Sequence, residues 1–222
     1  MRKTVLFLIG ALVISFPAYA ITWLTPNLVV NPGAETGDTS GWEVYGPAYA
    51  TTSQSQSTGT VLPHSGDYFF SYAQNAASDA VLVQYADVST FAGLIDSGQA
   101  YVQAGFWYQT EEYQGSSDEA FGSLGFFEGD SSDMPFDVLT SDPLVSSSWA
   151  YTEVMELIPA GTRTIGLAMI GELESGSYVN AFFDDAQLRV GTETVIPEPA
   201  TLLLLGSGLL GLGGTRLRRR KR

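Results

Sequence analysis

The 222-residue sequence contains no cysteine and a single histidine, His64. The lack of cysteine excludes disulfides, thiolate metal sites and cysteine-dependent catalysis, so a folded domain must be stabilised by its apolar core. A histidine-rich zinc site is also excluded, and His64 is the sole candidate base for a conventional catalytic triad. It lies in the turn-like segment LPHSGD (62–67), which indicates a loop residue rather than a catalytic base.

Positive charge is almost absent between residues 21 and 199. Eight of the ten basic residues lie near the two ends of the chain, which leaves Arg163 and Arg189 against 24 acidic residues, a formal net charge of −22. A surface of this sign repels nucleic-acid phosphates and anionic membranes, so neither is expected as its partner. The acidity suits divalent cations, and its simpler interpretation is that it keeps an extracellular protein soluble.

Helical periodicity and internal repeats are also lacking. Short apolar and aromatic runs recur between clusters of Gly, Pro, Ser, Asp and Asn, which is typical of an all-β sandwich. Several of these runs alternate with a period of two, as half-buried strands do. We expect polar loops at 51–60 and 129–135. The predicted strands are 101–108, 121–127, 149–158, 164–170 and 182–190.

The N-terminal residues have the features of a secretory signal peptide. Two basic residues precede an apolar stretch at 4–16, and Ala18 and Ala20 frame a small-x-small cleavage site. We therefore expect export through the Sec pathway and removal of residues 1–20, with Ile21 as the first residue of the mature chain. The alternative, an uncleaved membrane helix, requires a longer apolar run than this one.

The last 26 residues have the form of a second targeting signal. Pro197, Glu198 and Pro199 precede an apolar segment at 200–214 and a basic end at 216–222. At ~1.5 Å per residue this segment reaches about 22 Å, so it is a marginal anchor for a hydrocarbon core of ~30 Å. The basic end is expected to stay cytoplasmic. A GPI signal would lack it, and a Gram-positive sortase signal would need a different pentapeptide.

This C-terminal pattern resembles the sorting signal of bacterial exported proteins that exosortase-type membrane enzymes process. The resemblance implies a protein that is transiently anchored in the inner membrane, is then cut, and reaches the cell surface or the medium. It also implies a context of extracellular polysaccharide or biofilm. We accordingly divide the chain into a signal peptide at 1–20, a domain at 21–190, a linker at 191–196 and a sorting signal at 197–222.

A series of motifs crosses the domain in a recognisable order. They are NLVVNPGAE (27–35), GW (41–42), HSGDY (64–68), QYADV (84–88), IPAGTR (158–163) and FDDAQL (183–188). The series resembles the galactose-binding-like jelly roll of several carbohydrate-binding modules. It implies an all-β, two-sheet antiparallel jelly-roll sandwich, flanked here by the signal peptide and a C-terminal hydrophobic sorting helix. A fold of this kind hosts lectins, enzyme appendages and structural modules alike, so it does not fix an activity.

Asp184 is the residue whose placement most needs an explanation. Strand alternation puts it on the face of Phe182 and Leu188, so we expect its carboxylate to point into the core and Asp185 to point outward. A buried carboxylate needs compensation. In the modules that the chain resembles, an acidic residue near each end holds a structural calcium ion, and the matching positions are Glu35 and Asp184. The alternative is that Asp184 accepts backbone N–H bonds from the N-terminal segment without a metal.

Three classes of function remain open. A non-catalytic carbohydrate-binding module, associated with extracellular polysaccharide, would need exposed aromatic rings beside polar groups. Tyr113, which Glu111, Glu112 and Gln114 flank, is the best candidate ring, whereas Trp42 is expected in the core. The second class is a structural matrix protein without a specific ligand. The third is a hydrolase, but the sequence shows no catalytic constellation, and glycosidases need two carboxylates ~5–10 Å apart across a cleft.

Overall fold

The computed structural model describes residues 18–56, 59–72, 79–113, 116–130, 134–174 and 178–196. The chain divides into one unit at Thr22–Glu193 and another made of Met1–Ile21 and Thr194–Arg222. The predicted signal peptide up to residue 17 and the sorting signal from Pro197 onward lie outside the described residues. Within the described residues, no helix has the length and apolar character needed to cross a membrane.

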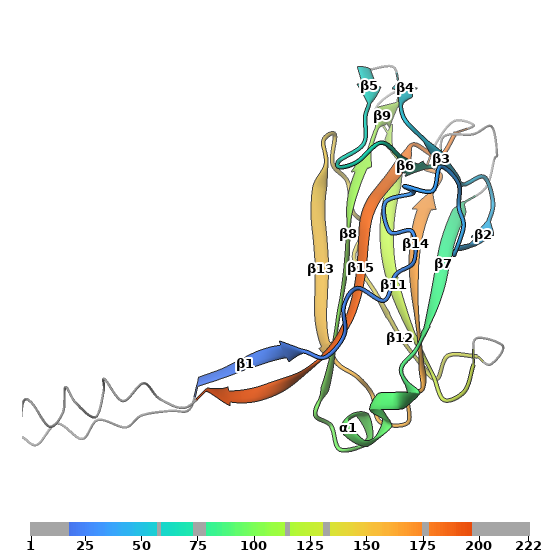
Figure 1. Cartoon of the computed structure of the whole chain (residues 1–222). Helices are drawn as coiled ribbons and strands as arrows, with labels where there is room; N and C mark the ends of the chain where they lie inside the picture. The colour runs from blue at the N-terminus through green and yellow to red at the C-terminus, as the bar shows by residue number, and fades with distance from the viewer. Residues whose placement is uncertain are drawn as a thin grey trace, which may run out of the picture. The chain divides into compact units, whose positions relative to one another are not determined.

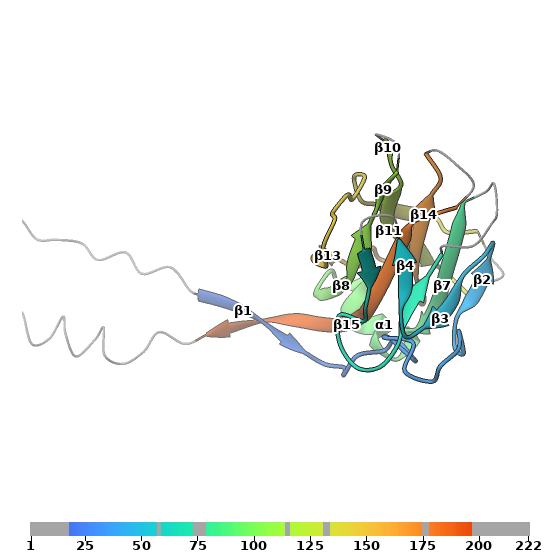
Figure 2. The same cartoon turned by 90° about the horizontal axis from the view of Figure 1, so that it is seen from above.

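The larger unit is a sandwich of two antiparallel sheets (Figures 1 and 2). The first sheet has the strand order β13-β8-β15-β6-β3, and β1 also pairs with β15. Its strands are β13 (Ala150–Leu157), β8 (Ala100–Thr110), β15 (Ala181–Ile196), β6 (Phe69–Ser71), β3 (Tyr49–Thr51) and β1 (Ala18–Trp23). The prediction of an all-β two-sheet antiparallel sandwich is confirmed.

The second sheet has the order β12-β11-β14-β7-β2. Its strands are β12 (Asp137–Thr140), β11 (Glu119–Phe127), β14 (Thr164–Glu172), β7 (Ala80–Asp87) and β2 (Glu43–Tyr45). The remaining elements are two short strand pairs and two consecutive short helices. These are β4 (Gln54–Gln56) with β5 (Gly59–Val61), β9 (Glu112–Tyr113) with β10 (Ser116–Ser117), η1 (Ser89–Phe91) and α1 (Ala92–Asp96). Figure 1 shows α1 at the opposite end of the sheets from β4 and β5.

Two local predictions differ from the structure. The segment 51–60 is not a plain loop, because β4 and β5 form a hairpin whose last residue, Val61, is buried beside Phe69. The expected linker at 191–196 is the end of β15, since Gly191 and Thr192 continue the ladder with β8. In both cases tertiary pairing gives regular structure to a sequence that looks like a connection.

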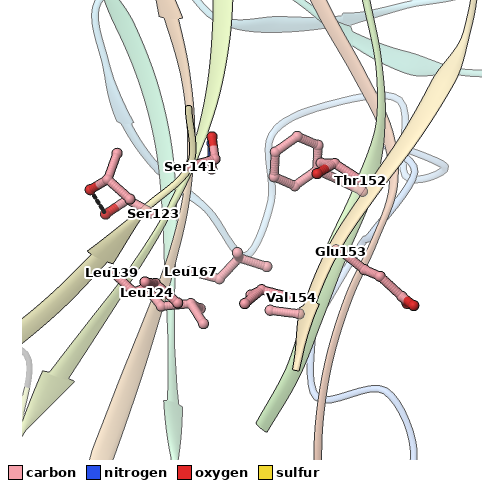
Figure 3. A pocket seen from close by; sticks show the side chains of 13 residues that line it. Ser123, Leu124, Leu139, Ser141, Thr152, Glu153, Val154 and Leu167 are labelled. Carbon is pink, nitrogen blue, oxygen red and sulfur yellow. Dashed lines mark hydrogen bonds between the residues drawn. The ribbon is translucent and has the colours of Figure 1, made fainter. Parts of the chain in front are cut away.

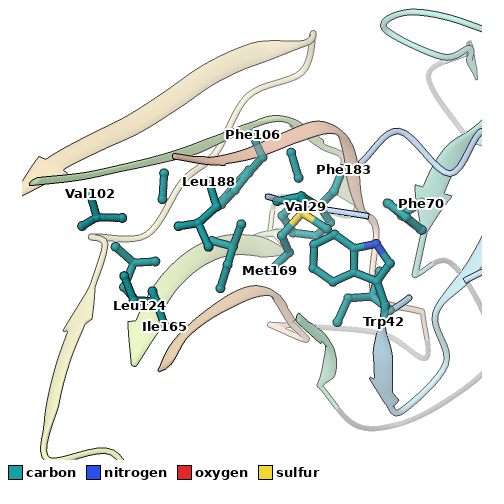
Figure 4. Packing of buried hydrophobic residues seen from close by; sticks show 14 of the residues in the cluster. Val29, Trp42, Phe70, Val102, Phe106, Leu124, Ile165, Met169, Phe183 and Leu188 are labelled. Atoms are coloured by element: carbon teal, nitrogen blue, oxygen red, sulfur yellow. The ribbon is translucent and has the colours of Figure 1, made fainter. Parts of the chain in front are cut away.

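The main core fills the space between the two sheets (Figure 4). Phe106 and Phe183 from the first sheet pack edge to face, with ring centroids 5.4 Å apart. Trp42 is 7 % exposed, which confirms its predicted core position, and its Nε1 donates to the Asn31 carbonyl at 3.2 Å. Other core residues labelled in the figure are Val29, Phe70, Val102, Leu124, Ile165, Met169 and Leu188.

A bulge in β15 changes which residues face this core. Asp184 pairs with Trp107 of β8 and Gln187 with Gly105, so β15 has one extra residue between these pairs. Asp185 within the bulge has a φ of 48°. An extra residue reverses the alternation of side chains between the two faces.

The prediction that Phe182 shares a face with Leu188 is therefore wrong. Leu188 lies in the main core, as Phe183 does. Phe182 lies on the outward side of the first sheet, in a second cluster with Val61 and Phe69. Phe182 and Phe183 are consecutive and precede the bulge, so ordinary alternation gives β15 apolar contacts on both faces near its start.

Candidate functional site

Three neighbouring strands place a row of functional side chains on the outward side of the first sheet. In the register of these strands, Trp107, Gly105 and Gln103 of β8 each have one partner in β13 and one in β15. We call this surface the outer face. Its rows are Tyr151, Trp107 and Asp184; then Glu153, Gly105 and Gln187; then Met155, Gln103 and Arg189.

Two aromatic rings lie at one end of the outer face, next to Gly105 of β8. The rings of Trp107 and Tyr151 lie 5.4 Å apart at 45°, and Tyr151 is 38 % exposed. Gly105 lets these neighbours pack against the β8 backbone, because a Cβ there would lie 2.5 Å from the Thr152 carbonyl oxygen, 2.8 Å from the Tyr151 hydroxyl and 2.9 Å from Cβ of Glu153. A larger residue at 105 would displace these neighbours.

Hydrogen-bonding groups surround Gly105. Glu153 Oε2 accepts from Gln103 Nε2 at 2.8 Å and from the Tyr151 hydroxyl at 3.1 Å. Gln187 Nε2 donates to the same hydroxyl. Burial, with the negative charge of Glu153, raises the pKa of Tyr151 to about 12, so its hydroxyl stays protonated at neutral pH. Amide, hydroxyl and carboxylate groups are thus held in fixed positions beside an aromatic pair.

Arg189 closes the far end of the outer face. Its Nη2 donates to Gln187 Oε1 at 3.1 Å, and its guanidinium lies 5.0 Å from the ring of Trp23. The two ion pairs within the described residues are Arg163 with Asp96 and His64 with Asp185, so Arg189 takes part in neither. Arg189 Nε and Gln103 Oε1, from directly opposed residues, are buried without a hydrogen-bond partner in the described part of the chain.

A second group of functional side chains lies where the start of β15 meets the loop between β5 and β6. Asp184 is fully buried, and its Oδ2 accepts from the backbone N–H groups of His64 at 2.9 Å and Ser65 at 3.2 Å. Asp185 Oδ2 lies 2.7 Å from His64 Nδ1, and its Oδ1 accepts from the Ser65 hydroxyl at 2.8 Å. The His64 ring stacks on Trp107 at 3.7 Å, which links this group to the outer face. We call His64, Asp184 and Asp185 the His–Asp–Asp cluster.

The side chains of these two aspartates do not point in the directions that strand alternation predicts. Asp184 is buried as predicted, but beneath the loop that carries His64, on the side of the sheet away from the main core. Asp185 does not point outward, because its positive φ turns the carboxylate toward the same loop. Burial, with the nearby charge of Asp185, raises the pKa of Asp184 to about 7.

Glu35 holds the other end of that loop. Its oxygens accept from the backbone N–H of Asp67 at 3.1 Å, and Oε1 also accepts from that of Tyr68 at 3.0 Å. Glu35 and Asp184 therefore both bind backbone donors of one loop, at 64–68. A calcium ion held by these two carboxylates stays a prediction. The group of potential ligand atoms around Asp184 contains His64 and Asp185, and Glu35 is not a member of it.

A cavity of about 240 Å³ opens at one edge of the sandwich, between the two sheets (Figure 3). Thr152 and Val154 line it from the first sheet, and Leu124 and Leu167 from the second. The Glu153 side chain points away from it in Figure 3. Apolar and hydroxyl groups thus make up its interior, which is not the pair of facing carboxylates that glycoside hydrolysis requires.

The structure does not test the roles predicted for the other site residues. Tyr113 lies in β9, and its side chain is outside what the structure describes. Ala18 and Ala20, the predicted cleavage residues, lie in β1. The sorting residues Pro197, Glu198 and Pro199 lie outside the described residues.

The outer face was missed in the sequence, although one signal for it is present. In 101–108 the residues between the apolar ones are Tyr101, Gln103, Gly105 and Trp107, which is an aromatic and amide pattern on the second face of that strand. Tyr151 and Glu153 repeat the pattern in the next strand of the sheet. No local signal shows that these two strands lie side by side.

Comparison with known families identifies one part of the chain. Residues 195–220 match the family model described as the PEP-CTERM protein-sorting motif. The chain therefore carries a PEP-CTERM sorting motif at its C-terminal end, which implies an exported protein sorted by an exosortase. No curated protein matches the sequence.

Solved structures with the same fold cover most of the chain. The carbohydrate-binding module TmCBM61, in complex with β-1,4-galactotriose, aligns with a TM-score of 0.50 and 20 % identity over 74 % of this chain and 98 % of that one. The enzymatically active domain of bacteriophage CBA120 tailspike protein 4 aligns with a TM-score of 0.53 and 14 % identity over 74 % of this chain. The chain spans only 21 % of that tailspike chain. These similarities confirm the jelly-roll sandwich and, at such identities, show the fold alone.

Proposed function

We propose that the domain is a non-catalytic carbohydrate-binding module of an exported, exosortase-processed protein, and that a polysaccharide lies on its outer face. The observation that carries this proposal is the aromatic pair Trp107 and Tyr151 next to a row of polar side chains on the same face of the sheet. Apolar sugar faces stack on aromatic rings, and sugar hydroxyls both donate and accept hydrogen bonds. The face supplies both kinds of contact.

The polar groups around Gly105 support the same ligand class. Glu153 accepts hydrogen bonds, and Gln103 and Gln187 provide amide donors and acceptors. Such side chains match neutral hydroxyl groups, and the formal charge of −22 between residues 21 and 199 repels polyanions. The ligand that we propose is therefore a neutral extracellular polysaccharide. TmCBM61, which shares the fold, was solved with a neutral galactose trisaccharide.

The test is binding of the exported protein to a glycan array, followed by titration of the best-binding glycan with tryptophan fluorescence. Tyr151→Ala and Glu153→Gln should each weaken binding at least tenfold, which corresponds to about 1.4 kcal/mol. The matched control is Tyr45→Ala. Tyr45 donates to Glu43 at 3.1 Å on the second sheet, as Tyr151 does to Glu153 on the first, so its loss should leave binding unchanged.

A structural matrix protein without a specific ligand is the second candidate. It is favoured by the stacking of His64 on Trp107, which covers one face of that ring. Failure of every glycan on the array to bind would support it and contradict the sugar-binding proposal.

A further inference from the structure

The cavity of about 240 Å³ between the two sheets, which we call the edge cavity, takes no part in the sugar-binding proposal. It is lined by β12 and β13, and within the described residues each of these is the end strand of its sheet. Leu139 of β12 lines the cavity and is 36 % exposed, so the cavity reaches solvent beside this strand. A small molecule can therefore enter it without unfolding of either sheet.

Leucine side chains form the wall on the side of the second sheet. Leu139, Leu124 and Leu167 are register partners across β12, β11 and β14, so they form one row on the inner face of this sheet. Leu124 and Leu167 are each 2 % exposed. Figure 3 shows the three leucines on one side of the cavity, with Thr152 and Val154 on the other.

The wall on the side of the first sheet is also largely hydrocarbon. In the register of β13 and β8, Val154 pairs with Ala104 and Thr152 with Phe106, and all four line the cavity. Ala104 contributes only a methyl group. The Phe106 ring packs directly against the β11 backbone, because a Cβ at Gly122 would lie 2.8 Å from its Cε1. The wall is thus made of one ring and small aliphatic groups.

One hydroxyl of the lining has no hydrogen-bond partner among the described residues, and it belongs to Thr152. The hydroxyls of Ser123 and Thr140 bond to each other at 3.2 Å, and that of Ser141 donates to a backbone carbonyl. Glu153 is the charged residue of the lining, and its side chain points away from the cavity in Figure 3. The cavity thus offers an apolar interior with one hydroxyl that can donate or accept.

We propose that the edge cavity binds the alkyl chain of a small neutral amphiphile, for which 1-octanol is the representative, with the ligand hydroxyl beside Thr152. An apolar cavity of ~150 Å³ stays dry and takes up benzene, so scaling its six carbons by volume gives room for roughly ten carbon atoms here. The long chains of bilayer lipids exceed that size. The formal charge of −22 between residues 21 and 199 disfavours a carboxylate head group.

The proposal does not depend on sugar binding, because the two sites use opposite faces of β13. Thr152 and Val154 point into the edge cavity, whereas Tyr151 and Glu153 belong to the outer face. A glycan that binds the outer face and an alcohol that binds the cavity therefore have separate readouts. Either proposal can fail while the other holds.

The experiment uses the exported protein purified without detergent, because a detergent chain could itself enter the cavity. The protein is titrated with 1-butanol, 1-hexanol and 1-octanol, and NMR spectra record the leucine and valine methyl groups. 1-Octanol should shift the methyl resonances of Leu124, Leu167 and Val154. The resonances of Leu82, which is buried in the main core and does not line the cavity, should stay in place.

The dependence of affinity on chain length distinguishes a cavity from a surface. Each added methylene should tighten binding about threefold to fourfold, since each buried CH₂ adds a similar increment to the free energy of binding. The gain should stop at about ten carbons, where the cavity is full. Octanoate should bind more weakly than 1-octanol at pH 8, because its carboxylate is repelled by the acidic protein.

A substitution at the opening locates the site. Leu139→Trp should weaken 1-octanol binding at least tenfold, because the indole would fill the opening. The matched control is Val138→Trp in the same strand. Val138 is 52 % exposed, and strand alternation places its side chain on the other face of β12, so this variant should bind like the wild type.

A second substitution tests the hydroxyl. Thr152→Val keeps the branched shape of the side chain but removes its hydroxyl, so it should weaken 1-octanol binding roughly threefold to tenfold. Toluene, which has no polar group, should bind this variant as well as it binds the wild type. An equal loss for both ligands would show that Thr152 acts through packing alone and contradict its role as hydrogen-bond partner.

Three results would overturn the proposal. In the first, no alcohol moves the cavity methyl resonances of the wild-type protein, which would make the cavity a packing void. In the second, affinity rises without a break to 1-dodecanol or survives Leu139→Trp, as association with the surface would. In the third, phosphatidylcholine vesicles shift the same methyl resonances, which would assign the cavity to a bilayer lipid. The wild-type titration decides the first and third results even if a variant does not fold.

Discussion

At the scale of single residues, Gly66 lies at the tightest contact of the loop that Glu35 and Asp184 hold. Its φ is +62°, and a Cβ there would overlap the Glu35 carboxylate. Gly66→Ala should therefore strain the backbone and disturb the hydrogen bonds from Glu35 to Asp67 and Tyr68. We expect a loss of roughly 2–3 kcal/mol in the free energy of unfolding, measured by urea denaturation.

Gly98→Ala provides the control for that experiment. Its φ of +67° is nearly the same, but nothing lies within 4 Å of a Cβ at this position. It should lose only about 1 kcal/mol, the part due to the left-handed backbone. Equal losses in the two variants would mean that the contact with Glu35 adds nothing to stability.

At the scale of elements, β15 packs on both of its faces near its start. Phe183 is fully buried in the main core and Phe182 in the second cluster. Phe183→Ala should lower the free energy of unfolding by about 3–5 kcal/mol. Phe182→Ala should cost less, because its cluster is small and the β5–β6 loop above it can close over the gap.

Hydrogen exchange separates the two effects. Phe182→Ala should speed exchange of the backbone N–H groups of His64 and Ser65, which donate to Asp184, while exchange within β8 stays slow. Phe183→Ala should raise exchange rates across both sheets. A uniform increase in the Phe182 variant would show that the second cluster does not act as a separate unit.

The alternation of core-facing and outward-facing residues made β8 and β14 predictable. Val102 and Phe106 of β8 and Leu167 of β14 face the core, as every second residue of such a strand does. The same rule failed in β15. The extra residue at Asp185 has no signature in sequence, since a bulge arises from pairing with a partner strand. Asp184 could be predicted as buried, but its partners could not. They come from a loop 120 residues away in sequence, and nothing local links His64 to this strand.

At the scale of the whole molecule, we expect processing at both ends of the chain. We expect cleavage after Ala20 and again near Pro197–Pro199, because a signal peptide pattern and a PEP-CTERM motif stand at the two ends. Mass spectrometry of the protein recovered from the cell surface or the medium measures both cuts. A main form that keeps the basic residues 218–222 would contradict the second.

The position of β15 within its sheet has a mechanical consequence. Its ladder with β8 extends from Ala181 to Thr192, β6 pairs with its start, and the backbone of residues 24–32 bonds to it further along. The C-terminal signal follows directly from this strand, which also carries Gln187 and Arg189 on the outer face. If the chain is held by its C-terminal end while a polymer is bound to that face, the pull runs along β15. Its ladder bonds lie across that direction and would be loaded together in shear, rather than broken one after another.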